Sequence, residues 1–200
     1  MLIAAADQPL EFVYFLENGL ASIVANSPEG HKVEAGIIGR EGYAHPAVVV
    51  QAESTPADIQ IQLSGDAHRI AARDLLEAVD RSRTLRRTLL RFVHANTVQT
   101  MYTALSNATH QLDERLARWL LMVHDRSESD DLALTHEFLS LMLGVRRPSV
   151  TNALHVLEGN HFINNVRGYI TIRNRPAMEE FAADAYGKPE AEYKRLLGPL

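Results

Sequence analysis

The sequence has no cysteine among its 200 residues. Disulfide bonds, thiolate catalysis, and zinc or iron–sulfur sites built on cysteine are therefore excluded. No run of apolar residues approaches the ~18 needed to cross a bilayer. The first six residues are apolar but have no basic flank and no long apolar region, so they do not form a signal peptide. We expect a cytoplasmic protein without membrane association.

The sequence also has no surplus of positive charge. It contains 20 Lys and Arg and 25 Asp and Glu, which gives a formal net charge of -5. Bulk charge therefore does not indicate a nucleic-acid-binding protein, and any DNA binding would depend on a local basic patch. The hydrophobic fraction of 46% is enough for one large domain or two small ones with hydrophobic cores.

Catalytic and metal-binding motifs are absent from the sequence. The nine histidines are scattered and show no metal-ligand spacing. We find no nucleophile elbow, phosphate-binding loop or paired-carboxylate motif. We therefore expect no enzyme, no metal and no cofactor, and a haem held by His31, His45 or His68 has no support in the pattern.

The first third of the chain has the pattern of β-structure. Residues 12–16 and 20–24 are rich in strand-forming side chains and flank a turn at residues 17–19, which predicts a hairpin. A second turn is expected at residues 27–30. Residues 59–63 alternate strictly between apolar and polar, as a half-buried strand does.

Proline and glycine are missing from residues 72–126, where helix-forming residues dominate. We predict a helix over about 72–79, a long helix from near Ser82, and a third from near Leu112, where Asp113 and Glu114 suit a helix N-terminus. The long helix and the residues after it carry two stripes. The first stripe comprises Leu85, Leu89, Phe92, Asn96, Gln99, Thr103 and Ser106, and the second Val98, Met101, Leu105, Ala108, Leu112 and Leu116.

One stripe would pack within the chain and the other against a twin helix, which predicts a homodimer. The residues assigned to dimerisation are Leu85, Leu89, Phe92, Asn96 and Gln99. A single buried helix in a monomer is the alternative.

Residues 134–172 have the pattern of two helices and a hairpin. Thr135 can cap the N-terminus of the first helix. Gly144 allows the positive φ that a tight corner between two helices requires, and Val145 can fill that corner.

Pro148 is tolerated in the first turn of the second helix, which is expected to end near Glu158. Residues 162–172 read as a hairpin, a wing with Arg167-Gly168 at its tip.

The second helix is amphipathic. Its apolar side holds Val150, Ala153, Leu154 and Leu157, and its polar side holds Pro148, Thr151, Asn152 and His155, with Ser149 on the flank. Arginine can bind guanine and asparagine can bind adenine in the major groove, while small hydroxyls suit phosphates. Residues 135–175 hold five arginines and two acids, a local charge of +3. We therefore predict a recognition helix, with Thr135, Arg146, Arg147, Ser149, Thr151, Asn152, His155 and Arg167 as DNA contacts.

The chain as a whole resembles the Crp/Fnr family of transcription regulators. The likeness follows the order of the chain and is most specific at Glu-Arg-Leu-Ala-Arg-Trp-Leu (114–120) and Leu-Gly-Val-Arg-Arg-Pro-Ser-Val-Thr (143–151). It is also carried by Val13-Tyr14-Phe15, Asn-Gly-Leu-Ala-Ser (18–22), Gly-Arg-Glu-Gly (39–42), and the wider segments 112–121 and 134–172.

The resemblance implies an α+β fold. Its parts would be a truncated cyclic-nucleotide-binding-like β-roll over 1–80, a dimerisation helix over 81–111, and a winged helix-turn-helix with a C-terminal helical extension over 112–200. It implies that Arg147 takes the place of the family's base-reading arginine and Asn152 that of a second base-contacting residue. Pro148 stands where the cyclic-AMP receptor protein has a cytosine-reading glutamate, so the operator must differ. The implied partners are double-stranded DNA and a second copy of the chain; RNA polymerase and an unidentified small-molecule effector stay open.

The sensor half departs from the family's cyclic-nucleotide site. Gly39 is followed by Arg40 instead of glutamate, and the phosphate-binding run is reduced to Thr55-Pro56-Ala57, without its arginine. Since a charge pair to phosphate is the strongest contact in such a site, we predict no response to cyclic AMP. Oxygen sensing through an iron–sulfur cluster fails for lack of cysteine. The sequence also starts late relative to the family, so either the start is assigned too far downstream or the roll is open at one edge.

Two other functions compete with DNA reading. One is an enzyme, but the sequence contains no catalytic motif that supports it. The other is a signalling module whose winged helix no longer reads DNA, and such a module would have no need of an exposed face made by Arg147, Ser149, Thr151 and Asn152.

Overall fold

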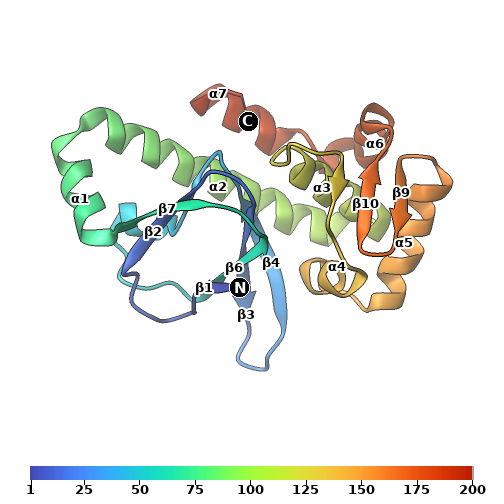
Figure 1. Ribbon diagram of the computed structural model, residues 1–200, viewed down its shortest axis with the longest axis horizontal. Helices are drawn as coiled ribbons and strands as arrows, with labels where there is room; N and C mark the ends of the chain where they lie inside the picture. The colour runs from blue at the N-terminus through green and yellow to red at the C-terminus, as the bar shows by residue number, and fades with distance from the viewer. Residues whose placement is uncertain (200) are drawn as a thin grey trace.

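The computed structural model describes residues 1–199 and places the β-rich half and the helical half at opposite ends of α2 (Figure 1). The strands of the first half are β1 (Leu2–Ala4), β2 (Phe12–Leu16), β3 (Leu20–Asn26), β4 (Lys32–Ile38), β5 (Tyr43–Ala44), β6 (Ala57–Leu63) and β7 (Ala67–Ala71), with the 3-10 helix η1 (Pro46–Val50) between β5 and β6. The rest comprises α1 (Ala72–Arg81), α2 (Arg83–Thr109), α3 (Leu112–His124), β8 (Asp131–Leu132), α4 (His136–Leu143), α5 (Arg147–Gly159), β9 (Ile163–Val166), β10 (Tyr169–Ile172), α6 (Arg175–Ala182), η2 (Ala183–Ala185) and α7 (Lys188–Leu197).

Two antiparallel sheets form the β-roll, one in the order β1-β6-β3-β4 and the other in the order β5-β2-β7. The predicted hairpin of β2 with β3 is wrong, because β2 pairs with β5 and β7 while β3 pairs with β4 and β6. Gly19, at φ 79°, lies in the turn where the chain crosses from one sheet to the other. Val13, Ala21 and Ile38 pack between the sheets with no exposed surface.

The helices begin where the sequence predicts. Ser82 caps α2, its hydroxyl accepting a hydrogen bond from the Leu85 amide at 3.2 Å. At the start of α3 the Glu114 carboxylate accepts from the Gln111 amide at 2.8 Å. No helix among residues 1–199 is both long and apolar enough to cross a membrane.

The buried face of α2 is the stripe assigned to dimerisation. Leu89, Phe92 and Gln99 are covered by the chain's own β-roll, and the Gln99 side-chain oxygen accepts from the Ile37 amide at 2.6 Å. These three side chains are therefore not available to a partner, while Leu85 and Asn96 are half-buried. The period of a helix shows that a face is apolar but not which surface covers it. In the other stripe, Met101 is 54% exposed and Leu105 46% exposed.

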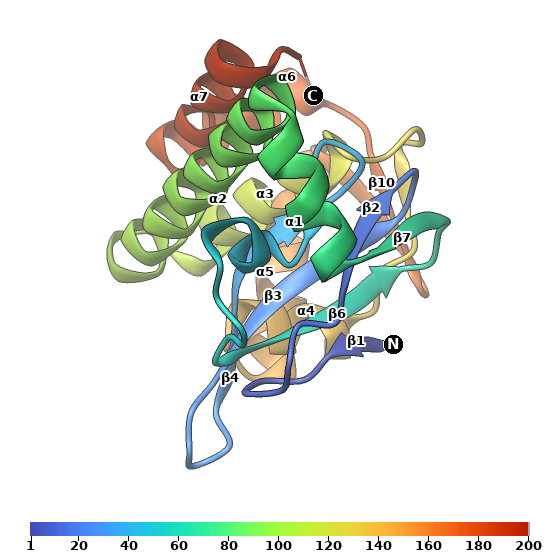
Figure 2. The ribbon, with the colours of Figure 1, turned by 90° about the vertical axis from the view of Figure 1, so that its left-hand side faces the viewer.

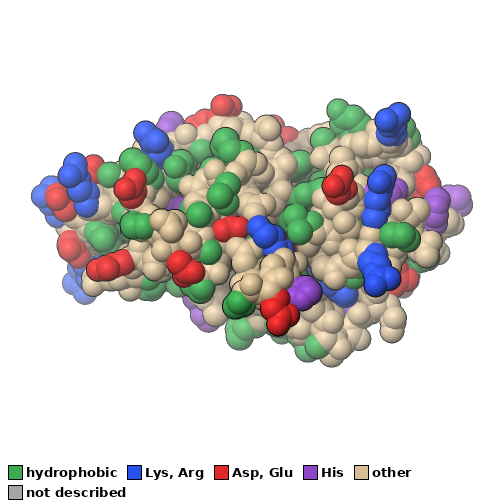
Figure 3. Space-filling view, turned by 90° about the horizontal axis from the view of Figure 1, so that it is seen from below, with side chains coloured by type: hydrophobic (Ala, Val, Ile, Leu, Met, Phe, Trp, Pro, Cys, Tyr) green, Lys and Arg blue, Asp and Glu red, His purple; other side chains and the backbone are tan. Residues whose placement is uncertain are grey.

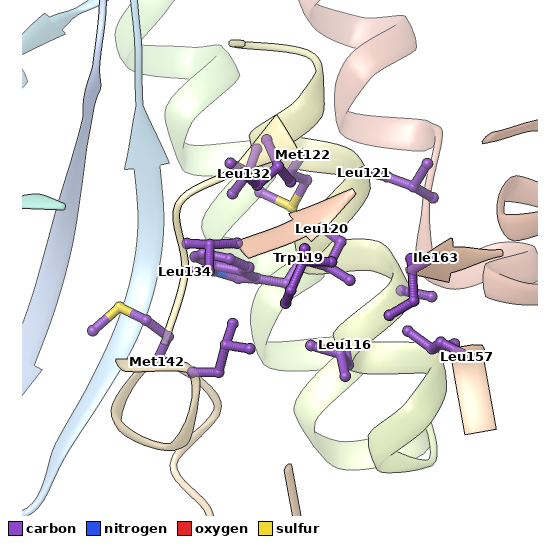
Figure 4. Close-up of a cluster of buried hydrophobic side chains, with 14 of the residues drawn as sticks. Leu116, Trp119, Leu120, Leu121, Met122, Leu132, Leu134, Met142, Leu157 and Ile163 are labelled. Carbon is purple, nitrogen blue, oxygen red and sulfur yellow. The ribbon is translucent and has the colours of Figure 1, made fainter. Parts of the chain in front are cut away.

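The core of the helical half is built around α3 (Figure 4). Leu116, Leu120 and Leu121 have no exposed surface, and they pack with side chains of α4, α5 and the β9–β10 hairpin. The same cluster includes Leu20 and Ile37 of the β-roll, whose interior forms a second cluster, so the core of the helical half extends onto one side of the roll.

The C-terminal helix α7 lies along α2 (Figures 1 and 2). The Tyr193 hydroxyl donates to the Glu41 carbonyl of the β-roll at 2.7 Å. His94 of α2 also meets Glu192 of α7, with 3.1 Å between His94 Nε2 and Glu192 Oε1. The extension thus packs against the first half of the chain.

Candidate nucleic-acid interface

The corner between α4 and α5 has the predicted local chemistry. The Thr135 hydroxyl caps α4 by accepting from the Phe138 amide at 3.2 Å. Gly144 ends α4 in the left-handed region at φ 64°, and half-buried Val145 packs against the core. The predicted cap at Thr135 and the predicted corner at Gly144 and Val145 are confirmed, and the corner sets the direction in which α5 leaves the domain.

The two faces of α5 differ as the sequence predicts. Val150, Leu154 and Leu157 have no exposed surface, and Ala153 is 5% exposed. Arg147, Pro148, Asn152 and His155 are exposed together with Arg146 just before the helix, while Ser149 and Thr151 are half-buried. The helix therefore presents a row of charged and hydrogen-bonding side chains to solvent.

The N-terminus of α5 is open to an anion. Arg146 occupies the cap position without a side-chain cap bond, and Pro148 sits in the first turn. The first amides of a helix that lack partners are suited to phosphate oxygens. Pro148 has no N–H and the Ser149 amide donates to the Arg146 carbonyl at 2.9 Å, so the donors left at this end are the Arg147 amide and the side chains of Arg146 and Arg147.

His136 is a residue of the interface that sequence reasoning missed. Its Nδ1 lies 3.1 Å from the Thr151 hydroxyl of α5, and its Nε2 lies 3.4 Å from the side-chain Nδ2 of Asn165 in the wing. His136, which lies in α4, thus contacts both α5 and the wing. In the sequence it is one of nine scattered histidines, and nothing in its spacing marks it.

The wing is the hairpin of β9 and β10, extended by β8 into a three-stranded sheet. Gly168 turns at φ 83°, and Arg167 at the tip is exposed. Val166 and Tyr169 are also exposed, at 58% and 55%. Seen from below, a row of Lys and Arg side chains runs over the end of the molecule that carries α5 and the wing (Figure 3).

The remaining candidates have local partners. Thr151 donates its hydroxyl to the Arg147 carbonyl at 3.2 Å. His155 is 67% exposed, with its Nδ1 4.0 Å from the Glu158 carboxylate. The Thr135 hydroxyl is engaged in its cap.

The helical half is joined to the β-roll by polar contacts as well as by apolar ones. Trp119 of α3 donates its indole N–H to Glu34 of β4 at 2.7 Å. Glu34 also accepts from the Ser22 hydroxyl, and its burial raises the pKa of this carboxyl to about 7. Arg126 and Glu41 form an ion pair at 2.7 Å, with side chains only 5% and 4% exposed.

No group of three or more His, Asp or Glu side chains within residues 1–199 is arranged to hold a metal ion. His31 lies 3.8 Å from Glu29 and His68 lies 2.8 Å from Glu17, both at the surface. His45 is buried, and this desolvation lowers its pKa to about 4. The three histidines therefore make separate contacts.

Part of the helical half of the chain matches a known protein domain. Residues 114–181 match the Crp-like helix-turn-helix domain. None of the curated proteins compared with the chain matches it.

Solved structures match nearly the whole chain. FixK2 from Bradyrhizobium japonicum is 17% identical, with 92% of this chain and 93% of that one covered and a TM-score of 0.75. TTHB099, a transcriptional regulator of the CRP family from Thermus thermophilus, is 18% identical, covering 91% and 93%, with a TM-score of 0.73. CLP of Xanthomonas campestris, a global regulator responsive to c-di-GMP, is 14% identical, covering 86% and 89%, with a TM-score of 0.65.

At these identities the structures show the fold, a β-roll, a long helix and a winged helix-turn-helix, as the sequence predicts. Residues 114–181 are thus similar to a Crp-like helix-turn-helix domain, and the chain as a whole shares the fold of these solved structures.

Proposed function

We propose that the chain binds an inverted-repeat operator as a homodimer, with one α5 in the major groove of each half-site. The observation that carries this proposal is the contrast between the buried and exposed faces of α5. Half-sites read by paired helices lie about one helical turn apart, ~34 Å. The regulator would act on DNA in the cytoplasm, with residues 1–80 as sensor, 81–111 as dimerisation helix and 112–200 as reading domain.

The exposed residues divide by chemistry into two roles. Arg146, Arg147 and Asn152 can form paired hydrogen bonds to base edges. The small hydroxyl side chains, the imidazole and the wing arginine suit phosphates and fix the register of the helix. This second set comprises Thr135, Ser149, Thr151, His155 and Arg167.

Binding to DNA fragments from the source genome, followed by fluorescence anisotropy on a selected site, tests the reading role. Arg147→Ala should weaken binding by about 1–3 kcal/mol and relax specificity at one base pair in each half-site. Arg167→Ala should weaken binding to all sequences alike and lower the salt slope by about one. Arg73→Ala, an exposed arginine on α1, is the control.

An equal loss on every sequence for Arg147→Ala would move that residue to the phosphate set. A protein that showed no preference among random duplexes would not be a reader of DNA sequence, which would favour the signalling module instead.

We place the dimer contact on the solvent side of α2. A row of exposed side chains there repeats every three or four residues, the spacing of a two-stranded coiled coil. The row comprises Leu90, His94, Thr97, Met101, Ala104 and Ala108, with Leu105 beside it. Its exposed apolar members leave a surface that a twin helix would cover.

Met101→Lys should convert the dimer to monomer, since it puts like charges opposite each other across the contact. Sedimentation velocity measures the change. Val50→Lys is the matched control, because Val50 is also 54% exposed but lies outside α2. A Met101→Lys protein that still sedimented as a dimer would place the contact elsewhere.

We infer that cyclic AMP is not the effector. Arg40, the arginine nearest in sequence to the family's ribose-binding position, pairs with Glu128 at 3.1 Å and so lies against the reading half. Titration calorimetry with cyclic AMP should give no binding heat, and operator affinity should not change when the nucleotide is added. A cyclic-AMP-dependent gain in operator affinity would refute this inference.

A further inference from the structure

The first three turns of α2 concentrate positive charge. Residues 83–91 hold four of the chain's 20 Lys and Arg and no acid, although the whole chain carries a net charge of -5. No Asp or Glu occurs anywhere in α2, which spans 27 residues. The N-terminal part of this helix is therefore a cationic patch on an acidic protein.

This arrangement is unfavourable for the isolated helix. Arg83 and Arg86 lie in the first turn, where the helix dipole favours acids and opposes cations. Arg83, Arg87 and Arg91 follow one another at intervals of four residues, which places like charges side by side. An anion bound beside them would reverse both effects.

The patch lines a groove of about 550 Å³ between α2 and the end of α7. The basic side chains that line it are Arg83, Arg86, Arg87, Arg91 and His94, and the apolar ones are Leu90 of α2 and Leu196 of α7. Its volume lies in the range of small-molecule sites.

Some of these cations are fixed and others are free to bind. Arg91 donates to the Leu196 carbonyl at 3.1 Å, and Arg86 pairs with Asp80. Within residues 1–199, Arg83 and Arg87 make no ion pair or side-chain hydrogen bond in the structure. The guanidinium groups of Arg83 and Arg87 are thus exposed to solvent, beside the two arginines that have partners.

The spacing of the arginines selects the class of ligand. From Arg83 to Arg91 the helix advances about 12 Å, so one small anion could not meet all of them. Guanidinium groups bind phosphate oxygens in a planar, two-pronged geometry. A molecule with several phosphate groups can satisfy neighbouring arginines at once.

We propose that this arginine groove binds a small anion carrying two or more phosphate groups. The groove lies at the opposite end of α2 from α5, so the site is separate from the DNA-reading face (Figure 1). The proposal does not depend on the operator, but Leu90 and His94, which line the groove, also belong to the row proposed for the dimer contact.

Isothermal titration calorimetry of the full chain with inorganic tripolyphosphate tests the site. The wild type should bind one tripolyphosphate per chain, and inorganic phosphate more weakly. The double variant Arg83→Gln/Arg87→Gln should bind tripolyphosphate at least about tenfold more weakly, since each lost charge-assisted contact corresponds to that order. Arg73→Gln/Arg173→Gln removes the same charge from exposed sites outside the groove and should bind like the wild type.

Equal affinities in the two double variants, or no heat with tripolyphosphate at millimolar concentration, would overturn the site. Inorganic phosphate binding as tightly as tripolyphosphate would overturn the requirement for several phosphates. A random duplex that displaced tripolyphosphate, and lost affinity only in Arg83→Gln/Arg87→Gln, would assign the groove to nucleic-acid backbone instead of a small molecule. Thermal unfolding of each variant without ligand verifies that it is folded.

Discussion

Replacing Glu34 by glutamine should make the protein's stability less dependent on pH. The Glu34 carboxylate is fully buried between the β-roll and α3, where it accepts from the Ser22 hydroxyl and the Trp119 indole. Burial raises its pKa from 4.5 to about 7, against the opposing effects of these hydrogen bonds and of Arg118 and Arg126. Glutamine keeps the shape, its oxygen can accept from the Trp119 indole and its NH2 group can donate to the Ser22 hydroxyl, but it does not ionise.

The direction of the effect follows from proton binding. Between pH 4.5 and about 7 the folded state holds a proton on Glu34 that the unfolded state has released. Stability from this group is therefore complete below pH 4.5 and is lost as the pH rises through about 7. At 1.36 kcal/mol for each pKa unit, the wild type should lose about 2 to 3 kcal/mol relative to Glu34→Gln between pH 5 and pH 8.

Urea unfolding at a series of pH values measures this difference, and the fluorescence of Trp119, the only tryptophan, reports it next to the substituted group. Glu29→Gln, which changes an exposed carboxylate, should leave the profile of the wild type in place. If the free energies of unfolding of Glu34→Gln and the wild type stayed parallel from pH 5 to pH 8, the reasoning about the buried carboxyl would be wrong.

Two further substitutions test the packing around α2 and α3, each by urea unfolding. Glu41→Ala leaves the buried Arg126 guanidinium without its 2.7 Å partner and should lower the free energy of unfolding by about 3–5 kcal/mol; a loss below about 1 kcal/mol would show that water reaches the arginine. Gly42→Ala puts a methyl group 2.1 Å from the Phe92 ring and should cost at least about 1–3 kcal/mol. Gly159→Ala, where nothing lies within 4 Å, should cost less than Gly42→Ala, and equal losses would contradict the steric argument.

The helix-turn-helix region could be predicted closely because its signals are local. A cap at Thr135, a left-handed corner at Gly144 and the two faces of α5 are each decided within a few residues of chain. The turn at Gly168 between β9 and β10 is of the same kind. Local sequence therefore sufficed to separate the side chains that α5 buries from those it exposes.

The remaining features depend on surfaces that lie far apart in the sequence. The turn at Gly19 looks like that of a hairpin, but each flanking strand finds its partners in a different sheet. The stripe at Leu89 and Phe92 is apolar because the β-roll covers it, and its period would be the same under a twin helix. His136 gains its position only when α4, α5 and the wing meet.

The bond from Tyr193 to the Glu41 carbonyl joins residues 152 positions apart. During synthesis, the β-roll leaves the ribosome long before α7 is made, so this side of α2 stays uncovered until α7 has been synthesised. A purification tag or fusion partner attached directly after α7 could disturb the packing of this helix on α2 and on the β-roll. An attachment ahead of β1 avoids that helix.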